Sequence, residues 1–231
     1  MATITHAAGP VNDPHDPHVG HHYTSTGLDN RKIAIWTLIG SECMLFVSLI
    51  ATYMVYKGRS LKGPLPHEPW TNVQTGESFP AILDIPVTSA STFVLLMSSL
   101  AMVLAHNAVV HKLEPKHTLG DRIIGNSKLW LAMTAILGMV FLGFQAFEFT
   151  AFVNEGLGIT TNLFGSTFFV LTGFHGAHVT VGVIWLLILW IDMFRGRLAP
   201  TQSLRLEIAG LYWHFVDIVW IAIFTLIYLM E

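Results

Sequence analysis

Residues 164–194 read FGSTFFVLTGFHGAHVTVGVIWLLILWIDMF and contain a single Asp, Glu, Lys or Arg, which is Asp192. A helix rises 1.5 Å per residue, so about 20 such residues cross a hydrocarbon layer of about 30 Å. Lipid offers the peptide backbone no hydrogen bonds, so the segment must be a helix or a strand of a closed barrel. Barrel strands alternate apolar and polar residues, which this stretch does not. It therefore predicts a transmembrane helix that is tilted or extends beyond the bilayer.

The rest of the chain repeats this pattern. Only 12% of its residues are charged, about half the share in a soluble domain, so no charged surface for water can be built. Loops rich in Pro, Gly or charge separate the apolar stretches. One cysteine, Cys43, excludes an intramolecular disulfide and a cysteine-pair metal site. The sequence predicts an all-α, polytopic membrane helix bundle with five transmembrane helices, at 33–56, 84–110, 129–153, 164–194 and 207–230.

Basic residues predict the orientation. Nine of the 12 Lys and Arg fall on the side of the N-terminus, and Lys57, Arg59 and Lys62 fall on the other. Because cytoplasmic loops are enriched in basic residues, the N-terminus is expected in the cytoplasm and the C-terminus outside. Residues 1–31 form a polar His/Pro-rich tail, and 32–231 one membrane domain. Near span ends, amphipathic rings are expected at the membrane interface: Tyr53, Tyr56, Trp130, Trp190 and Tyr228.

Several polar side chains fall inside the predicted spans, where each is costly and needs a reason. Residues three or four apart share a helix face, so Gln145 lies on one face with Glu148, and His175 lies on one face with His178. In the last span the polar and small residues form one stripe. The candidate proton-related or buried polar residues are Glu42, Glu148, His175, His178, Glu207, His214 and Asp217, with Gly210 in the same stripe.

The residues alone leave the roles of these groups open. Glu42 either handles a proton or forms a neutral hydrogen bond in an apolar environment, and Glu148 and His214 can pair between helices. His175 and His178 lie among small residues, which favours helix packing over metal ligation. We expect no metal in this chain, because no cysteine pair, haem-attachment motif or nucleotide loop accompanies the histidines. The histidines of the tail are not expected to bind a metal either.

Two motifs resemble the cytochrome c oxidase subunit III family. The first is Phe164-Gly165-Ser166-Thr167-Phe168-Phe169 followed by Thr172-Gly173-Phe174-His175-Gly176-Ala177-His178. The second is Tyr212-Trp213-His214-Phe215-Val216-Asp217-Ile218-Val219-Trp220, preceded by Glu207. Ser41-Glu42 with Met44 and Phe46, and Gln145 with Glu148, resemble two further helices of that family. The resemblance covers about residues 33–231, in the family's order.

The resemblance implies a non-catalytic subunit III of a proton-pumping haem–copper oxidase in a bacterial cytoplasmic membrane. This chain is the five-span form, without the first two of the seven helices in longer members. Haems and copper are expected in partner subunits I and II, and none in this chain. Subunit III is expected to stabilise the catalytic subunit, support proton uptake and bind phospholipid. Arg195, His214 and Glu207 are the expected lipid-binding residues; for Arg195 an ordinary positive-inside anchor is the alternative.

Cytochrome c is the expected electron donor. A quinol oxidase or a nitric oxide reductase accessory subunit of the same family is the first alternative. A free-standing proton or ion transporter using Glu42, Glu148 and Asp217 is the second, although no inverted repeat supports it. A membrane enzyme with a histidine-based metal site is the third.

Overall fold

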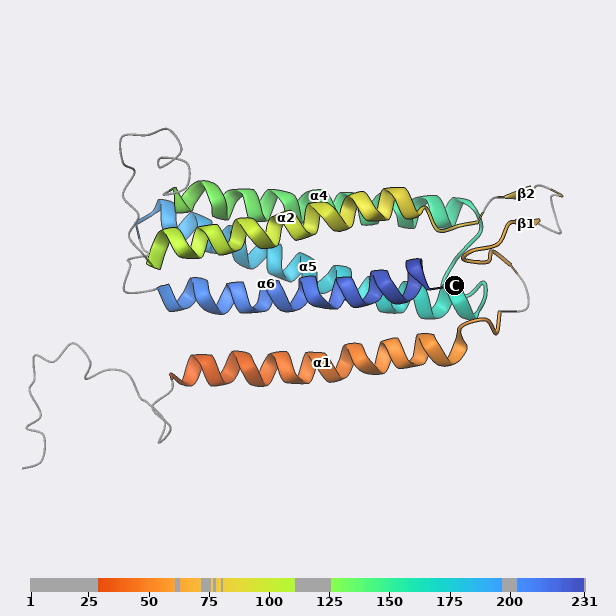
Figure 1. Cartoon of the computed structure of the whole chain (residues 1–231), viewed down its shortest axis with the longest axis horizontal. Coiled ribbons are helices and arrows are strands. Elements are labelled where there is room, and N and C mark those ends of the chain that lie inside the picture. Colours follow the sequence, from red (N-terminus) through yellow and green to blue (C-terminus); the bar gives the residue numbers. More distant parts are fainter. Residues whose placement is uncertain are drawn as a thin grey trace, which may run out of the picture.

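Five long helices dominate the computed structural model, which describes residues 29–60, 63–71, 76, 78–79, 81–110, 126–196 and 203–230 (Figure 1). All five are long and apolar enough to cross a membrane, so the predicted all-α membrane bundle with five spans is confirmed. They are α1 (Asn30–Tyr56), α2 (Ile85–Val110), α4 (Ser127–Asn154), α5 (Leu163–Phe194) and α6 (Ser203–Phe224), which continues as the π-helical turn η2 (Thr225–Leu229).

Asparagine or aspartate side chains cap the start of four of the helices. Asp29, Asp84, Asn126 and Asn162 each accept a hydrogen bond from a backbone N–H of the first turn, at 2.8, 3.3, 3.2 and 2.7 Å. Such caps satisfy donors that have no partner inside the helix. The last helix begins at Ser203, four residues before the expected start. Hydropathy detects the membrane-embedded part of a helix, and this first turn is polar.

Helix α6 is central to the bundle. It packs against α1, α2 and α5, while α4 packs against α2 and α5. Within the most apolar window of each helix, 56% of α6 is buried, whereas only 11% of α1 is. The starts of α1, α4 and α6 lie at one end with the ends of α2 and α5, and the C-terminus lies at the other (Figure 1).

Two tryptophans of α6 contact the neighbouring helices α2, α4 and α5. The ring of Trp213 fills the space beside Gly138 of α4 and Gly182 of α5, where an added Cβ would lie 2.6 and 2.9 Å from it. Its Nε1 donates to the hydroxyl of Ser98 on α2 at 3.0 Å, and Trp220, two turns later, donates to Thr92 at 3.0 Å. Lipid is as apolar as a side chain, so close packing and hydrogen bonds of this kind hold the helices together.

Helix α1 contacts the bundle along a narrow stripe. Its buried residues are Ile35, Phe46 and Tyr53, and most of its other apolar side chains are exposed. Three polar contacts add to this stripe. Lys32 pairs with Glu207 at 2.7 Å at one end, Glu42 meets His178 in the middle, and the amine of Lys57 donates to the Met230 carbonyl at 2.6 Å at the other.

Two local features differ from the sequence predictions. Within the loop after α1, β1 (Trp70–Thr71) pairs antiparallel with β2 (Ser78–Phe79), a strand pair that helical spans do not predict. Tyr53 and Tyr228, whose rings were predicted at the membrane interface, are only 1% and 2% exposed, because their rings pack inside the bundle. The predicted tail and its histidines lie outside the described residues, apart from its last three positions.

Candidate functional site

A carboxyl–imidazole pair joins α1 to α5. Oε2 of Glu42 lies 3.0 Å from Nε2 of His178, and the side chains are 24% and 17% exposed. The other ring nitrogen, Nδ1, lies 2.8 Å from the backbone carbonyl of Phe174. Phe46 packs edge-on against the imidazole, with centroids 5.0 Å apart. Glu42 therefore meets a specific polar partner, and both roles predicted for it, proton handling and a neutral hydrogen bond, remain predictions.

The hydrogen-bond partners of His178 indicate which of its ring nitrogens donates. A carbonyl only accepts hydrogen bonds, so Nδ1 of His178 carries a hydrogen. The contact between Nε2 and Glu42 then needs one further proton, which is held by the carboxyl or by the ring. Both arrangements have the same total charge of zero. The pair can therefore shift a proton between two atoms without changing the charge of the bundle.

His175 is placed differently, although it lies one turn from His178. It is completely buried, stacked on Trp220 with centroids 4.8 Å apart and perpendicular to Phe141 at 5.9 Å. Neither ring nitrogen has a hydrogen-bond partner among the described residues. A charged ring would be costly in such surroundings. This histidine acts as an aromatic element of the core, which agrees with the packing role favoured by the sequence.

Gln145 and Glu148 are both buried on one face of α4, as their spacing predicts, but they contact different helices. The amide of Gln145 donates to the Thr172 carbonyl of α5 at 2.7 Å. Glu148 accepts a hydrogen bond from the Thr88 hydroxyl of α2. Glu148 and His214, which could have paired between helices, do not pair in the structure. Each finds a hydroxyl on α2 instead, and the partner of His214 is Ser99, at 2.7 Å.

Glu207, Gly210 and His214 line one groove between α6 and α2, with a volume of about 190 Å³. His106 of α2 completes its polar lining. Asp217 belongs to the same stripe of α6 but is 3% exposed and does not line the groove, and its carboxyl oxygens have no hydrogen-bond partner among the described residues.

Arg195 lies apart from this groove. It ends α5 and is exposed, and it is not among the residues that line the cavity. At the same end of the bundle, Arg205 pairs with Asp192 at 3.0 Å. The structure thus brings together two of the three residues expected to bind lipid, His214 and Glu207.

The three histidines of the spans do not converge. His175 contacts Trp220, His178 contacts Glu42 and His214 contacts Ser99. Nowhere in the described part of the chain do three His, Cys, Asp or Glu side chains come close enough to hold a metal ion. The arrangement gives no support to a histidine-based metal enzyme.

Sequence reasoning missed the hydroxyl partners Thr88 and Ser99 and the groove residue His106. Serine and threonine in helices usually bond to the carbonyl one turn earlier, as Thr134 does to Trp130, so nothing in the sequence marks the hydroxyls that bond to another helix. His106 lies at the predicted end of the second span, where a polar residue is unremarkable by composition.

The fold and these groups define an integral-membrane helix bundle with paired ionisable side chains inside it. The sequence matches the family Cytochrome c oxidase subunit III over residues 16–231. The chain therefore belongs to the cytochrome c oxidase subunit III family.

Relatives with two kinds of name resemble the chain to similar degrees. It is 35% identical to cytochrome c oxidase subunit 3 of Bacillus sp. (strain PS3) over 87% of this chain and 86% of that one. It is 36% identical to quinol oxidase subunit 3 of Bacillus subtilis, over 86% of each chain. It is 32% identical to cytochrome bo(3) ubiquinol oxidase subunit 3 of Pseudomonas aeruginosa, over 94% and 93%. The chain is thus a haem–copper oxidase subunit III, a multi-pass bacterial membrane protein that belongs to a complex with a catalytic subunit.

Proposed function

We propose that this chain is the non-catalytic subunit of a proton-pumping terminal oxidase, where it stabilises the catalytic subunit, supports proton uptake and binds phospholipid. Haems and copper are held by partner subunits I and II, and cytochrome c is the donor. Because relatives named for cytochrome c and for quinol have nearly equal identity, the donor is tested directly. A mild-detergent pull-down should recover a haem-bearing partner, and the eluate should oxidise reduced cytochrome c in preference to a quinol.

The single observation that supports the proton role is the Glu42–His178 pair. It is partly exposed on the flank of the bundle, and it holds one transferable proton between two atoms 3.0 Å apart. Ionisable residues within membrane spans commonly mark proton relays. Supply of protons from such a pair to the neighbouring catalytic subunit keeps that subunit protonated during turnover and so protects it from inactivation.

Glu42→Gln tests this role. The glutamine amide still donates to Nε2 of a neutral His178, so the contact between α1 and α5 is kept while the transferable proton is removed. The assembled oxidase should start at the parental rate and inactivate faster during continuous turnover. The matched control is Glu155→Gln, in which the changed residue caps the C-terminal end of α4. The activity of this variant should decay at the parental rate. Equal decay of Glu42→Gln and parent would refute the proton role.

The orientation rests on charge. One end of the bundle carries four basic residues, Lys32, Lys128, Arg195 and Arg205. The other end carries Lys57 and Arg59 (Figure 1). The positive-inside rule favours a cytoplasmic N-terminus and an outside C-terminus. Labelling of single cysteines introduced at Arg59 and Arg195 in intact cells tests this orientation, since an impermeant reagent should reach only the position at Arg59. The exposed native Cys43 is replaced by serine first.

The lipid role rests on the exposed guanidinium of Arg195 and on the groove with His106, Glu207 and His214 at the same end. An Arg fork binds phosphate oxygens in pairs. Arg195→Ala should lower the anionic phospholipid that copurifies with the complex. Arg205→Ala removes equal charge from a residue already engaged by Asp192, and it should leave the lipid content unchanged. If Arg195→Ala does not change the lipid content, Arg195 serves only as a positive-inside anchor.

A further inference from the structure

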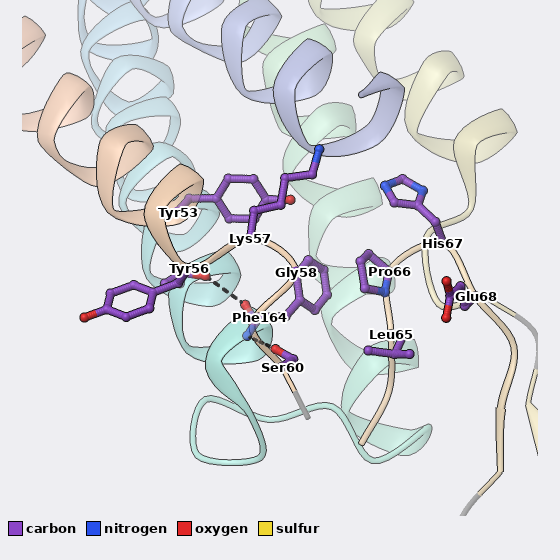
Figure 2. Close-up of a pocket in the computed structure, with 11 residues that line it drawn as sticks. Tyr53, Tyr56, Lys57, Gly58, Ser60, Leu65, Pro66, His67, Glu68 and Phe164 are labelled. Carbon is purple, nitrogen blue, oxygen red and sulfur yellow. Dashed lines mark hydrogen bonds between the residues drawn. The ribbon is translucent and has the colours of Figure 1, made fainter. Parts of the chain in front are cut away.

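A second cavity lies at the other end of the bundle, where α1 ends and α5 begins (Figure 2). Its volume is about 470 Å³, within the range of small-molecule sites. Its polar lining includes Tyr53, Lys57, Ser60 and His67. It shares no described lining residue with the groove between α2 and α6, so it is a separate feature of the molecule.

Hydrogen bonds to two other segments hold the cavity wall in place. The amide of Asn162 donates to the Pro64 carbonyl at 3.0 Å, and the backbone N–H of Phe164 donates to the Ser60 hydroxyl at 3.0 Å. Ile82 donates its N–H to the Leu65 carbonyl at 3.5 Å. The segment after α1 is therefore fastened both to the start of α5 and to the segment before α2, so the cavity is formed before any ligand arrives.

Polar atoms in this cavity lack partners. The hydroxyl of Tyr53, a residue only 1% exposed, and Nε2 of His67 are buried without a hydrogen-bond partner among the described residues. Burial of such groups is unfavourable unless something pairs with them. Tyr53 and Lys57 both line the cavity, whereas in Figure 2 the Tyr56 hydroxyl points away from the other labelled residues.

Several side chains that line the cavity can donate a hydrogen bond, and one of these donors is charged. The ammonium of Lys57 has three hydrogens and gives one to the Met230 carbonyl, so two remain. The Ser60 oxygen accepts from Phe164, which leaves its own hydrogen for donation. Tyr53 adds an O–H, and His67 adds an N–H in the tautomer that carries its hydrogen on Nε2. Glu68, the only acid among the described lining residues, is exposed at the rim.

We infer that this cavity binds a phosphate group, carried by a lipid headgroup or present as free phosphate. Phosphate oxygens accept several hydrogen bonds and pair with a cation, which matches two hydroxyls, an imidazole and an ammonium around one space. The site lies at the ends of membrane spans, at the depth of lipid headgroups. The inference does not depend on the proposed function, because it rests on other residues at the other end of the bundle.

The assembled oxidase, stripped of loosely held lipid, tests the site with three probes. They are phosphatidylglycerol, diacylglycerol with the same chains, and inorganic phosphate; native mass spectrometry reads lipid binding, and equilibrium dialysis with radiolabelled phosphate reads the ion. The variants are Lys57→Gln and Tyr53→Phe. Tyr56→Phe and Arg59→Gln are matched controls. Tyr56 lines the cavity, but its hydroxyl points away from the other labelled residues in Figure 2, and Arg59 is not among the described lining residues.

Loss of a charge-assisted hydrogen bond should weaken the tightest phosphatidylglycerol site about tenfold or more in Lys57→Gln, and loss of the hydroxyl about threefold in Tyr53→Phe. Both controls should bind like the parent, and diacylglycerol should not occupy the site. Inorganic phosphate that binds with the same order of variants identifies the free ion as a ligand; phosphate that does not bind identifies the lipid. Equal phosphatidylglycerol binding in all variants, or equal binding of diacylglycerol, overturns the inference. If Tyr53→Phe does not assemble, Lys57→Gln decides, because its partly exposed side chain is replaced without opening the core.

Discussion

The packing of Trp213 against Gly138 gives the sharpest stability prediction. In Gly138→Ala the new Cβ would lie 2.6 Å from Cη2 of Trp213 and 2.9 Å from Cγ2 of Val183, whereas carbon atoms prefer about 3.5–4.0 Å. The ring cannot retreat toward α5, because the backbone of Gly182 already closes that side. One of the two helices must therefore move.

The expected cost combines three effects. Overpacking costs about 1–3 kcal/mol. A shifted indole also loses its bond to Ser98, worth about 1 kcal/mol, while alanine favours the helix by up to about 1 kcal/mol. Gly138→Ala should thus destabilise the fold by about 1–3 kcal/mol. Gly143→Ala, on the same helix with nothing within 4 Å of its Cβ, should be neutral or slightly stabilising.

SDS titration of the chain in mixed micelles, followed by far-ultraviolet circular dichroism, measures both variants. A double variant with Trp213→Phe adds a rescue test, because the smaller ring makes room for the methyl group. In the Trp213→Phe background, Gly138→Ala should cost clearly less than in the parent. Equal midpoints for Gly138→Ala and Gly143→Ala, or no coupling with Trp213→Phe, would refute the idea that this contact is closely packed.

Three further predictions use the same titration. Thr88→Val should destabilise the fold by about 1–3 kcal/mol, because Glu148 stays buried without its hydroxyl donor, and Thr88→Ser should restore most of the loss; parental stability of Thr88→Val would contradict this. Gly176→Ala places a Cβ 2.7 Å from Oε1 of Gln145 and should be destabilising, whereas Gly173→Ala, with nothing within 4 Å, should not; a reversed order would count against the close approach of α4 and α5. Lys32→Gln should lower the free energy of unfolding by less than about 1 kcal/mol, because its partner Glu207 is partly solvated. This loss of stability should shrink as salt is added, whereas a large, salt-independent loss would mean that the pair is shielded from water.

The helices were predictable because hydropathy reports directly on the cost of placing a residue in lipid. Contacts between helices were less predictable. Glu42 and His178 were both identified as candidates, yet their pairing depends on how α1 and α5 face each other, which a one-dimensional pattern does not contain. The partners of Glu148 and His214 were unpredictable for a similar reason, because Thr88 and Ser99 are indistinguishable in sequence from hydroxyls that bond within their own helix.

The cavity near Tyr53 shows a second limit. Tyrosine at the end of a membrane span predicts an interfacial ring, and Tyr56 is exposed on the surface of the bundle. Tyr53 lies one turn earlier and faces inward, where the loop after α1 folds over it. That loop is positioned by hydrogen bonds from Ile82 and from Asn162, which is 98 residues from its partner Pro64, so the cavity wall could not be inferred from local pattern.

The narrow attachment of α1 has a consequence for how the protein is made. The main partners of α1 are α5 and α6, so α1 lacks its main packing partners until these two later helices are made. Between Tyr56 and His178 lie about 120 residues, which take on the order of ten seconds to synthesise at about 5–20 residues per second. Throughout that interval Glu42 faces lipid without its imidazole, and α1 is a solitary span open to capture by insertion chaperones or membrane proteases. Arrival of His178 ends this exposed period, and substitutions that weaken the pair should first appear as fewer finished copies of the chain.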